Sequence, residues 1–217
     1  MQQCGRCGWR VDGDPRFCRI CDDDLVTKFG GQPVWRDAPQ WPSSAGLGLP
    51  MTFFGQVRLP AEIAGDGTWM AYVFFAPEGR HERWDGGDNA LIVQPGPGPA
   101  AVDTIPQATG PTITTPRHDG PGKYRPHRRK VLQEYAVELE PGLDPETWSD
   151  AVIEDIHGDW NKVGGTACWL QGAEVPDGAT FAFQFSPSAF GYELGDGAEA
   201  YAFVGGDGRG AWLWQCH

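Results

Sequence analysis

Lys28-Phe29-Gly30-Gly31-Gln32-Pro33-Val34-Trp35 decides the fold, because its pattern returns later in the chain. Lys162-Val163-Gly164-Gly165-Thr166-Ala167-Cys168-Trp169 has the same K-x-G-G-x-x-x-W spacing. The block FFGQ at 53–56 then corresponds to FAFQ at 181–184, and AYVF at 71–74 corresponds to AYAF at 200–203. Similar blocks in the same order predict a duplicated unit, a GG turn followed by two strands. We expect the repeats at about 28–94 and 131–217, with a positive φ in each glycine pair.

The rest of the body is typical of a sheet-rich domain. Runs rich in Val, Phe, Tyr or Trp and bounded by Gly, Pro or Asp predict strands. These runs are residues 51–58, 69–76, 90–94, 131–139, 180–185, 198–204 and 211–214. One helix start is supported, where Asp144 can cap and Pro145 suits the first helical position. The predicted fold class is α+β, mostly antiparallel β, for a domain spanning 27–217.

A Pro- and Gly-rich segment, 95–130, joins the two predicted repeats. It shows little periodicity, so we expect a long loop. It ends in the basic cluster 125–130, in a chain whose formal charge is -12. The cluster is either a solvated edge or a docking patch for an acidic partner.

The first residues carry a pattern that is typical of a metal site. Cys4 and Cys7 form one CxxC pair, and Cys18 and Cys21 form a second pair ten residues later. Four thiolates fill the tetrahedral coordination of Zn²⁺ and leave no position for a reacting water. We expect a zinc ribbon at 1–26 with one structural zinc. Disulfides, an iron–sulfur centre and a redox dithiol are the alternatives.

Composition limits the classes of partner. The negative charge disfavours generic nucleic-acid binding, which depends on clustered Lys and Arg. No apolar run approaches the roughly 18 residues that cross a bilayer, so we expect no membrane partner. No apolar signal segment precedes Cys4. We therefore expect a cytoplasmic protein.

The repeated blocks resemble the YwqG-like family of bacterial proteins, a domain of unknown function. The similarity covers about 28–217, in the blocks 30–33, 41–42, 49–56, 162–165, 169–171, 183–184, 195–197, 201–203 and 215–216. Ala167 and Leu194 depart from the family pattern, and the ribbon lies outside the family core. The resemblance implies a duplicated sheet domain without an established activity, and it supplies no catalytic residues.

Four polar residues are candidates for a ligand groove: Gln56, Gln171, Gln184 and Asp196. The glutamines end hydrophobic strands, so they could instead be buried hydrogen-bonding pairs across the pseudo-twofold. Cys168 and Cys216 lack a neighbouring base in the sequence, and we expect them to act as small buried hydrophobes. None of the five His residues, His157 included, falls in a metal-binding motif.

These features favour a non-catalytic, zinc-binding protein–protein interaction module of a regulatory or immunity type. An acidic surface suits a basic protein partner, and some of the ten Trp should be exposed as interface anchors. One alternative is nucleic-acid binding through the arginines of the ribbon. Another is a small-ligand or enzymatic site between the repeats, which a dry interface would disfavour. Catalytic activity stays open.

Overall fold

The structure is a computed structural model of the 217-residue chain. It describes residues 2–3, 10–11, 25–64, 68–76, 89–95, 102–117, 129–132, 134–145, 161–192, 194 and 196–216, with backbone alone at 2–3, 10–11, 115–117 and 129–132. Cys4, Cys7, Cys18 and Cys21 lie outside these residues, as do all five His and most of the predicted helix after Pro145.

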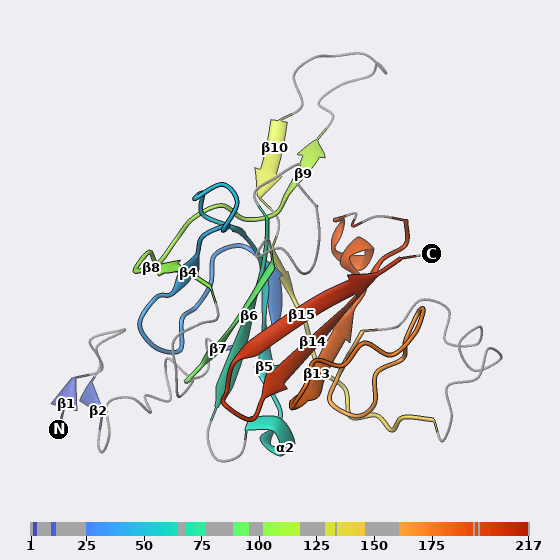
Figure 1. The fold of residues 1–217 in the computed structure, drawn as a ribbon. Helices are drawn as coiled ribbons and strands as arrows, with labels where there is room; N and C mark the ends of the chain where they lie inside the picture. The colour runs from blue at the N-terminus through green and yellow to red at the C-terminus, as the bar shows by residue number, and fades with distance from the viewer. Residues whose placement is uncertain are drawn as a thin grey trace, which may run out of the picture.

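One antiparallel sheet of nine strands, curled into a half-barrel, forms the body of the protein (Figure 1). In sheet order the strands are β11 (Glu134–Ala136), β3 (Lys28–Gly30), β5 (Thr52–Leu59), β6 (Trp69–Phe75), β7 (Asn89–Gln94), β15 (Gly210–Gln215), β14 (Glu199–Gly205), β13 (Ala179–Phe185) and β12 (Lys162–Val163). The fold is therefore mostly antiparallel β.

Smaller elements surround this sheet. The short strands pair as β1 (Gln2–Gln3) with β2 (Arg10–Val11), β4 (Trp41–Pro42) with β8 (Thr104–Ile105), and β9 (Thr114–Arg117) with β10 (Arg129–Leu132). Helix in the described residues is limited to α2 (Ala61–Ala64) and the 3₁₀ turn η1 (Pro187–Phe190).

The two halves of the sheet have equivalent strand orders, arranged symmetrically about the junction of β7 and β15. β3-β5-β6-β7 is followed by its mirror sequence, β15-β14-β13-β12. The registers match as well, because Lys28 pairs with Gln56 and Lys162 pairs with Gln184. A β-bulge interrupts β5 between Phe53 and Gly55, and another interrupts β13 between Phe181 and Phe183. The two halves thus share strand order, register and bulge position.

The inner, concave face of the sheet holds the main core, built from both halves. Aromatic rings fill it where the halves meet: Phe54 stacks on Phe185 with centroids 5.2 Å apart, and Phe75 meets Trp212 edge-on at 4.7 Å. The two strands at this junction, β7 and β15, pair only at Leu91 and Gly210. A Cβ on Gly210 would lie 2.6 Å from the Leu91 carbonyl, so only glycine permits this approach.

Each half covers its own outer face with the chain that follows its GG turn. In the first half Trp35 and Trp41 pack on Tyr72 and Phe74. In the second half Trp169 stacks on Tyr201 at 4.6 Å. The six described Trp side chains are buried or half-buried, and the other four Trp lie outside the described residues, so the expectation of exposed Trp stays a prediction.

Six of the seven predicted strands are confirmed to within a residue or two of their ends. The run 131–139 is not one strand. It is split between β10, which pairs with β9, and β11, which pairs with β3. The expected long loop at 95–130 contains two short, ordered strands, β8 and β9. Gly110 supports this ordering by exchanging two hydrogen bonds of 2.9 Å with the side chain of Gln32.

Candidate functional site

The GG turn of the first half is held by an ion pair. Gly30 and Gly31 have φ values of 76° and 65°, as predicted. Nζ of Lys28, largely buried, donates to the Glu134 carboxylate at 2.6 Å. The same carboxylate covers the turn, because a Cβ on Gly31 would lie 2.5 Å from Oε2 of Glu134.

The GG turn of the second half has an equivalent arrangement. Gly164 and Gly165 have φ values of 77° and 70°. Lys162 pairs with the Asp144 carboxylate, whose other oxygen accepts from the Thr166 N–H at 2.6 Å. A Cβ on Gly165 would collide with this carboxylate. Both acids come from the segment 134–145, which we call the strap.

Three polar side chains hold the chain that follows the first GG turn. The Gln56 amide accepts from Val34 N–H at 2.8 Å and donates to the Val26 carbonyl at 2.9 Å. The Tyr72 hydroxyl donates to the Val34 carbonyl at 2.9 Å and accepts from Arg36 N–H. Gln94 accepts from Asp37 N–H at 2.9 Å. These buried side chains supply hydrogen-bond partners for backbone N–H and C=O groups that pair with no strand.

The second half repeats this set of three polar side chains, and we call each set a lock. Gln184 accepts from Cys168 N–H at 2.8 Å, and the Tyr201 hydroxyl donates to the Cys168 carbonyl at 3.0 Å. Gln215 accepts from Gln171 N–H at 2.9 Å. The side chains of the lock are buried in both halves. Their hydrogen bonds fix structure and point to no bound ligand.

The candidate groove residues are not brought together. Gln56 on β5 and Gln184 on β13 are separated by four strands, and each bonds within its own half instead of pairing across the pseudo-twofold. The exposed Gln171 side chain donates to the Cys216 carbonyl at 2.6 Å. Asp196 is exposed beside β14. The described interface between the halves is lined by aromatic rings instead of these amides.

Cys168 is buried at 2% exposure, as expected for a small hydrophobe. Burial raises the pKa of its thiol to about 11, although the charge of Lys162 acts in the opposite direction. A thiol with this pKa stays protonated near pH 7 and is a poor nucleophile. Cys216 is half-buried.

Glu199 is the titratable residue that the sequence analysis missed. It is 6% exposed on β14, and one carboxylate oxygen accepts from the Ser186 hydroxyl. Burial raises its pKa to about 7, against the lowering effect of the Ser186 hydrogen bond. Within the described part of the chain its Oε2 has no hydrogen-bond partner, and neither has Nε2 of Gln184.

Strand alternation contained a signal for Glu199. It stands two residues before Tyr201, so both side chains lie on the outer face. In this half the outer face is covered by other residues. Glu199 is therefore buried although it lies at the end of its strand.

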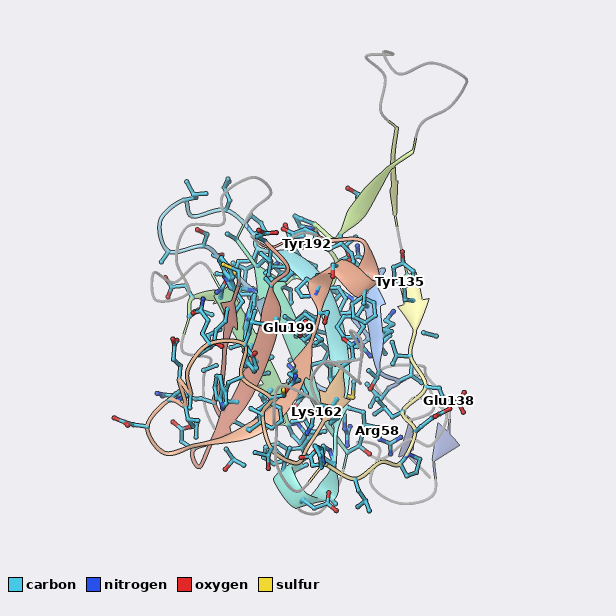
Figure 2. All side chains as sticks on the ribbon, turned by 90° about the vertical axis from the view of Figure 1, so that its right-hand side faces the viewer. Arg58, Tyr135, Glu138, Lys162, Tyr192 and Glu199 are labelled. Atoms are coloured by element: carbon cyan, nitrogen blue, oxygen red, sulfur yellow. The ribbon has the colours of Figure 1, made fainter. Side chains whose placement is uncertain are left out.

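The strap presents a different kind of surface. Leu143 is fully exposed and Leu139 is 48% exposed. The exposed Glu138 and Glu140 flank Leu139. Figure 2 shows the strap running down from Tyr135 past Glu138 along the edge of the sheet. Two exposed leucines flanked by carboxylates are the apolar and charged groups that this segment offers to a partner.

Two features are absent from the described residues. None of their helices is long and apolar enough to cross a membrane. No group of three or more His, Cys, Asp or Glu among them is arranged to share a metal ion. The zinc prediction concerns cysteines outside this set.

Comparison with known proteins returned no relative. No family model matches this chain, and no curated protein or solved structure matches it.

Proposed function

We propose that this protein is a non-catalytic interaction module whose strap binds a basic protein partner. The observation that carries the proposal is a pair of exposed leucines, Leu139 and Leu143, on a strap that is fixed at both ends. A fixed surface loses little conformational entropy on binding, which favours recognition.

The anchoring of the strap is strong for a surface segment. At one end β11 pairs with β3, and Val137 N–H donates to the Thr27 carbonyl at 3.1 Å. At the other end Asp144 bonds both Lys162 and Thr166. The two lysines neutralise Glu134 and Asp144, so Glu138 and Glu140 remain available to a partner.

The chemistry of the strap selects the class of partner. Its residues include four acidic side chains and no basic one. Carboxylates around an apolar anchor attract a surface rich in Lys and Arg and speed its association. Leucines that a partner desolvates supply binding free energy, at roughly 25 cal/mol per Å² of apolar area. By contrast, Gln56 and Gln184, which were candidates for a ligand groove, hydrogen-bond to backbone groups within the locks.

Photo-cross-linking tests the proposal. A benzophenone amino acid is placed at position 143 in cells, and a control chain carries it at Leu49, a leucine that is 51% exposed in the loop between β4 and β5. We expect an adduct with a basic protein specific to position 143. The affinity of that protein should then fall at least tenfold with Leu139→Ser/Leu143→Ser and with Glu138→Lys/Glu140→Lys. Adducts that are the same at both positions, or an affinity that neither variant changes, would sink the proposal.

We also propose that the two halves arose by duplication. Matched strand order, register, bulges, GG turns and locks support an origin by duplication, with repeats at about 28–94 and 131–217. The resemblance to the YwqG-like family and the N-terminal zinc ribbon are proposed from the sequence. The ribbon would hold one structural zinc through Cys4, Cys7, Cys18 and Cys21.

Nucleic-acid binding through the ribbon is a separate proposal with a simple test. Arg6, Arg10, Arg16 and Arg19 would supply the phosphate contacts. A salt-sensitive mobility shift with oligonucleotides that is lost on deletion of 1–26 would favour it over the strap.

A further inference from the structure

In the first half, a short stretch of the chain closes the edge of β5 beyond the end of β3. This stretch is residues 108–113, which we call the edge segment, and it lies beside β5 in a parallel bridge. The Phe53 N–H donates to the Pro111 carbonyl at 2.8 Å. The Phe53 carbonyl accepts from Ile113 N–H at 3.3 Å and from the Thr112 hydroxyl at 3.2 Å. The edge segment therefore satisfies backbone groups that an open edge would expose.

Two side chains that follow the first GG turn hold the other end of the edge segment. Nε1 of Trp35 donates to the Ala108 carbonyl at 2.9 Å. The Gln32 side chain exchanges its two hydrogen bonds with the backbone of Gly110. The edge segment carries no charged side chain. The first half is thus an internal example of how an extended, uncharged segment binds to this kind of edge.

The second half has the same edge, on β13, which is the orange strand beside β14 in Figure 1. Phe53 lies opposite Phe74 just before the bulge of β5, and its N–H and C=O point away from β6 to the edge segment. Phe181 lies opposite Phe203 just before the bulge of β13. Because the registers match, the N–H and C=O of Phe181 point away from β14. In the described part of the chain no segment pairs with Phe181 on that side.

Burial along the two edges differs in the way that an uncovered edge predicts. Thr52 and Phe53 are 5% and 0% exposed beside the edge segment. Their counterparts on β13 are Thr180, which is exposed, and Phe181, which is half-buried. The same residue types at the same register positions are therefore open to solvent in the second half.

The indole of Trp169 supplies a second, independent observation. Trp169 stands at the position of Trp35 in the repeated K-x-G-G-x-x-x-W pattern. Its ring stacks on Tyr201 and is half-buried. Nε1 of Trp35 is bonded to the edge segment, whereas Nε1 of Trp169 donates to no group among the described residues. The second half thus presents the donor that held the segment in the first half.

We infer that the edge of β13 at Phe181 binds an extended, uncharged segment of another protein, in the way that the edge segment binds β5. The segment adds parallel to β13 by strand addition. One of its carbonyls accepts from Phe181 N–H, and the N–H two residues later donates to the Phe181 carbonyl. A carbonyl three residues before the first one accepts from Nε1 of Trp169. This surface is separate from the strap, so the inference goes beyond the function proposed above.

A separate protein is a better occupant than a second copy of this chain. The edge segment of each copy is already bound to its own β5, and Ile113 is 3% exposed within the main core. Releasing the segment to a neighbour would expose Ile113 and leave the backbone of Phe53 unpaired. Two copies that each carry a formal charge of -12 also repel one another.

A fluorescent peptide with the sequence of residues 106–114 tests the inference by anisotropy with the full chain. We expect saturable binding at one site. N-methylation of the peptide amide that corresponds to Ile113 N–H should weaken binding about tenfold, the effect of one lost hydrogen bond. N-methylation at the amide of Thr114 is the matched control, because alternate N–H groups of a strand point away from its partner. It should leave the affinity unchanged.

Variants of the protein identify the site. Trp169→Phe keeps an aromatic ring on Tyr201 but removes Nε1–H, and it should weaken binding about fivefold. Trp214→Phe is the matched control, because this half-buried indole packs on the main core, and it should bind like the wild-type chain. A benzophenone amino acid at Thr180 should cross-link the peptide, whereas one at Leu49 should not. Circular dichroism checks that each variant folds.

Four results overturn the inference. They are a parent peptide that does not bind, equal weakening by the two methylated peptides, equal affinities of Trp169→Phe and Trp214→Phe, and cross-linking that is the same at both positions. A dimer in sedimentation velocity that the peptide dissociates would assign the edge to a second copy instead.

Discussion

The Gln56 amide bonds at both ends, whereas the amide of its counterpart Gln184 bonds only through Oε1. Gln56 joins Val34 N–H to the Val26 carbonyl. Gln184 accepts from Cys168 N–H, and its Nε2 is buried without a partner in the described residues. The same residue at the same register position therefore contributes differently to the two halves.

Methionine at each position should reveal this difference. Gln56→Met removes two hydrogen bonds and leaves the part-buried Val34 N–H and Val26 carbonyl unpaired, at up to about 1–3 kcal/mol for each group. Gln184→Met removes one hydrogen bond and also removes the unpaired Nε2. We expect Gln56→Met to lower the free energy of unfolding by about 1–3 kcal/mol more. Urea unfolding followed by Trp fluorescence measures both; an equal loss would contradict the asymmetry.

Alanine at Gly31 should cost more than alanine at Gly178. Both glycines have positive φ, at 65° and 69°, so each substitution introduces strain of about 1–2 kcal/mol. Gly178 has open space around its Cβ position, whereas Gly31 faces Glu134. Gly31→Ala must displace that carboxylate and leave the largely buried Lys28 without it.

A double-mutant cycle separates the strain from the lost ion pair. Glu134→Gln should destabilise the wild-type chain but have little further effect in Gly31→Ala, since the pair is already broken. Thermal unfolding of the four chains, with Gly178→Ala as the strain control, measures the coupling. Additive effects of Gly31→Ala and Glu134→Gln would show that the carboxylate does not cover the turn.

The sequence predicted the frame of this fold because its signals are local. GG pairs demand positive φ, and aromatic runs bounded by Gly or Pro demand strands, wherever the rest of the chain lies. The spacing of Lys28 and Lys162 to their glycines therefore located two equivalent turns. Their partners, Glu134 and Asp144, could not be predicted, because they come from one distant segment with no repeat pattern.

The contacts of the locks and of the strap could not be predicted from the sequence. The buried glutamines were recognised as a problem of hydrogen bonding, but their partners are backbone groups and leave no trace in the sequence. The basic cluster 125–130 was assigned to a loop, because register partners such as Arg117 and Arg129 are a tertiary fact. The exposure of Leu143 also depends on the tertiary structure, because a leucine next to Gly142 could equally lie in a buried turn.

Zinc should be present at one equivalent per chain and should depend on the N-terminal cysteines. Cys18→Ser removes one of four proposed ligands and should release the metal. Cys216→Ser is the matched control, because this thiol is outside the proposed site, and it should keep the zinc. Elemental analysis of protein purified without chelator measures both. A wild-type chain without zinc, or equal loss from both variants, would remove the ribbon from the proposal.

Glu199 should make the protein less stable as the pH rises from about 4.5 to about 7. Its pKa is about 7 in the folded chain against 4.5 for a free side chain, so between these values the folded state holds a proton that the unfolded state has lost. Unfolding then releases a proton, and the free energy of unfolding falls as the pH rises from about 4.5 to about 7. The total loss is roughly 3 kcal/mol, and little further change is expected above pH 8. Glu199→Gln stays neutral, so its advantage over the wild-type chain should grow across this window, whereas Glu138→Gln on the exposed strap should show no such growth. Urea unfolding of the three chains at pH 5 and pH 8 measures this; an advantage of Glu199→Gln that is the same at both values would show that burial does not hold the proton.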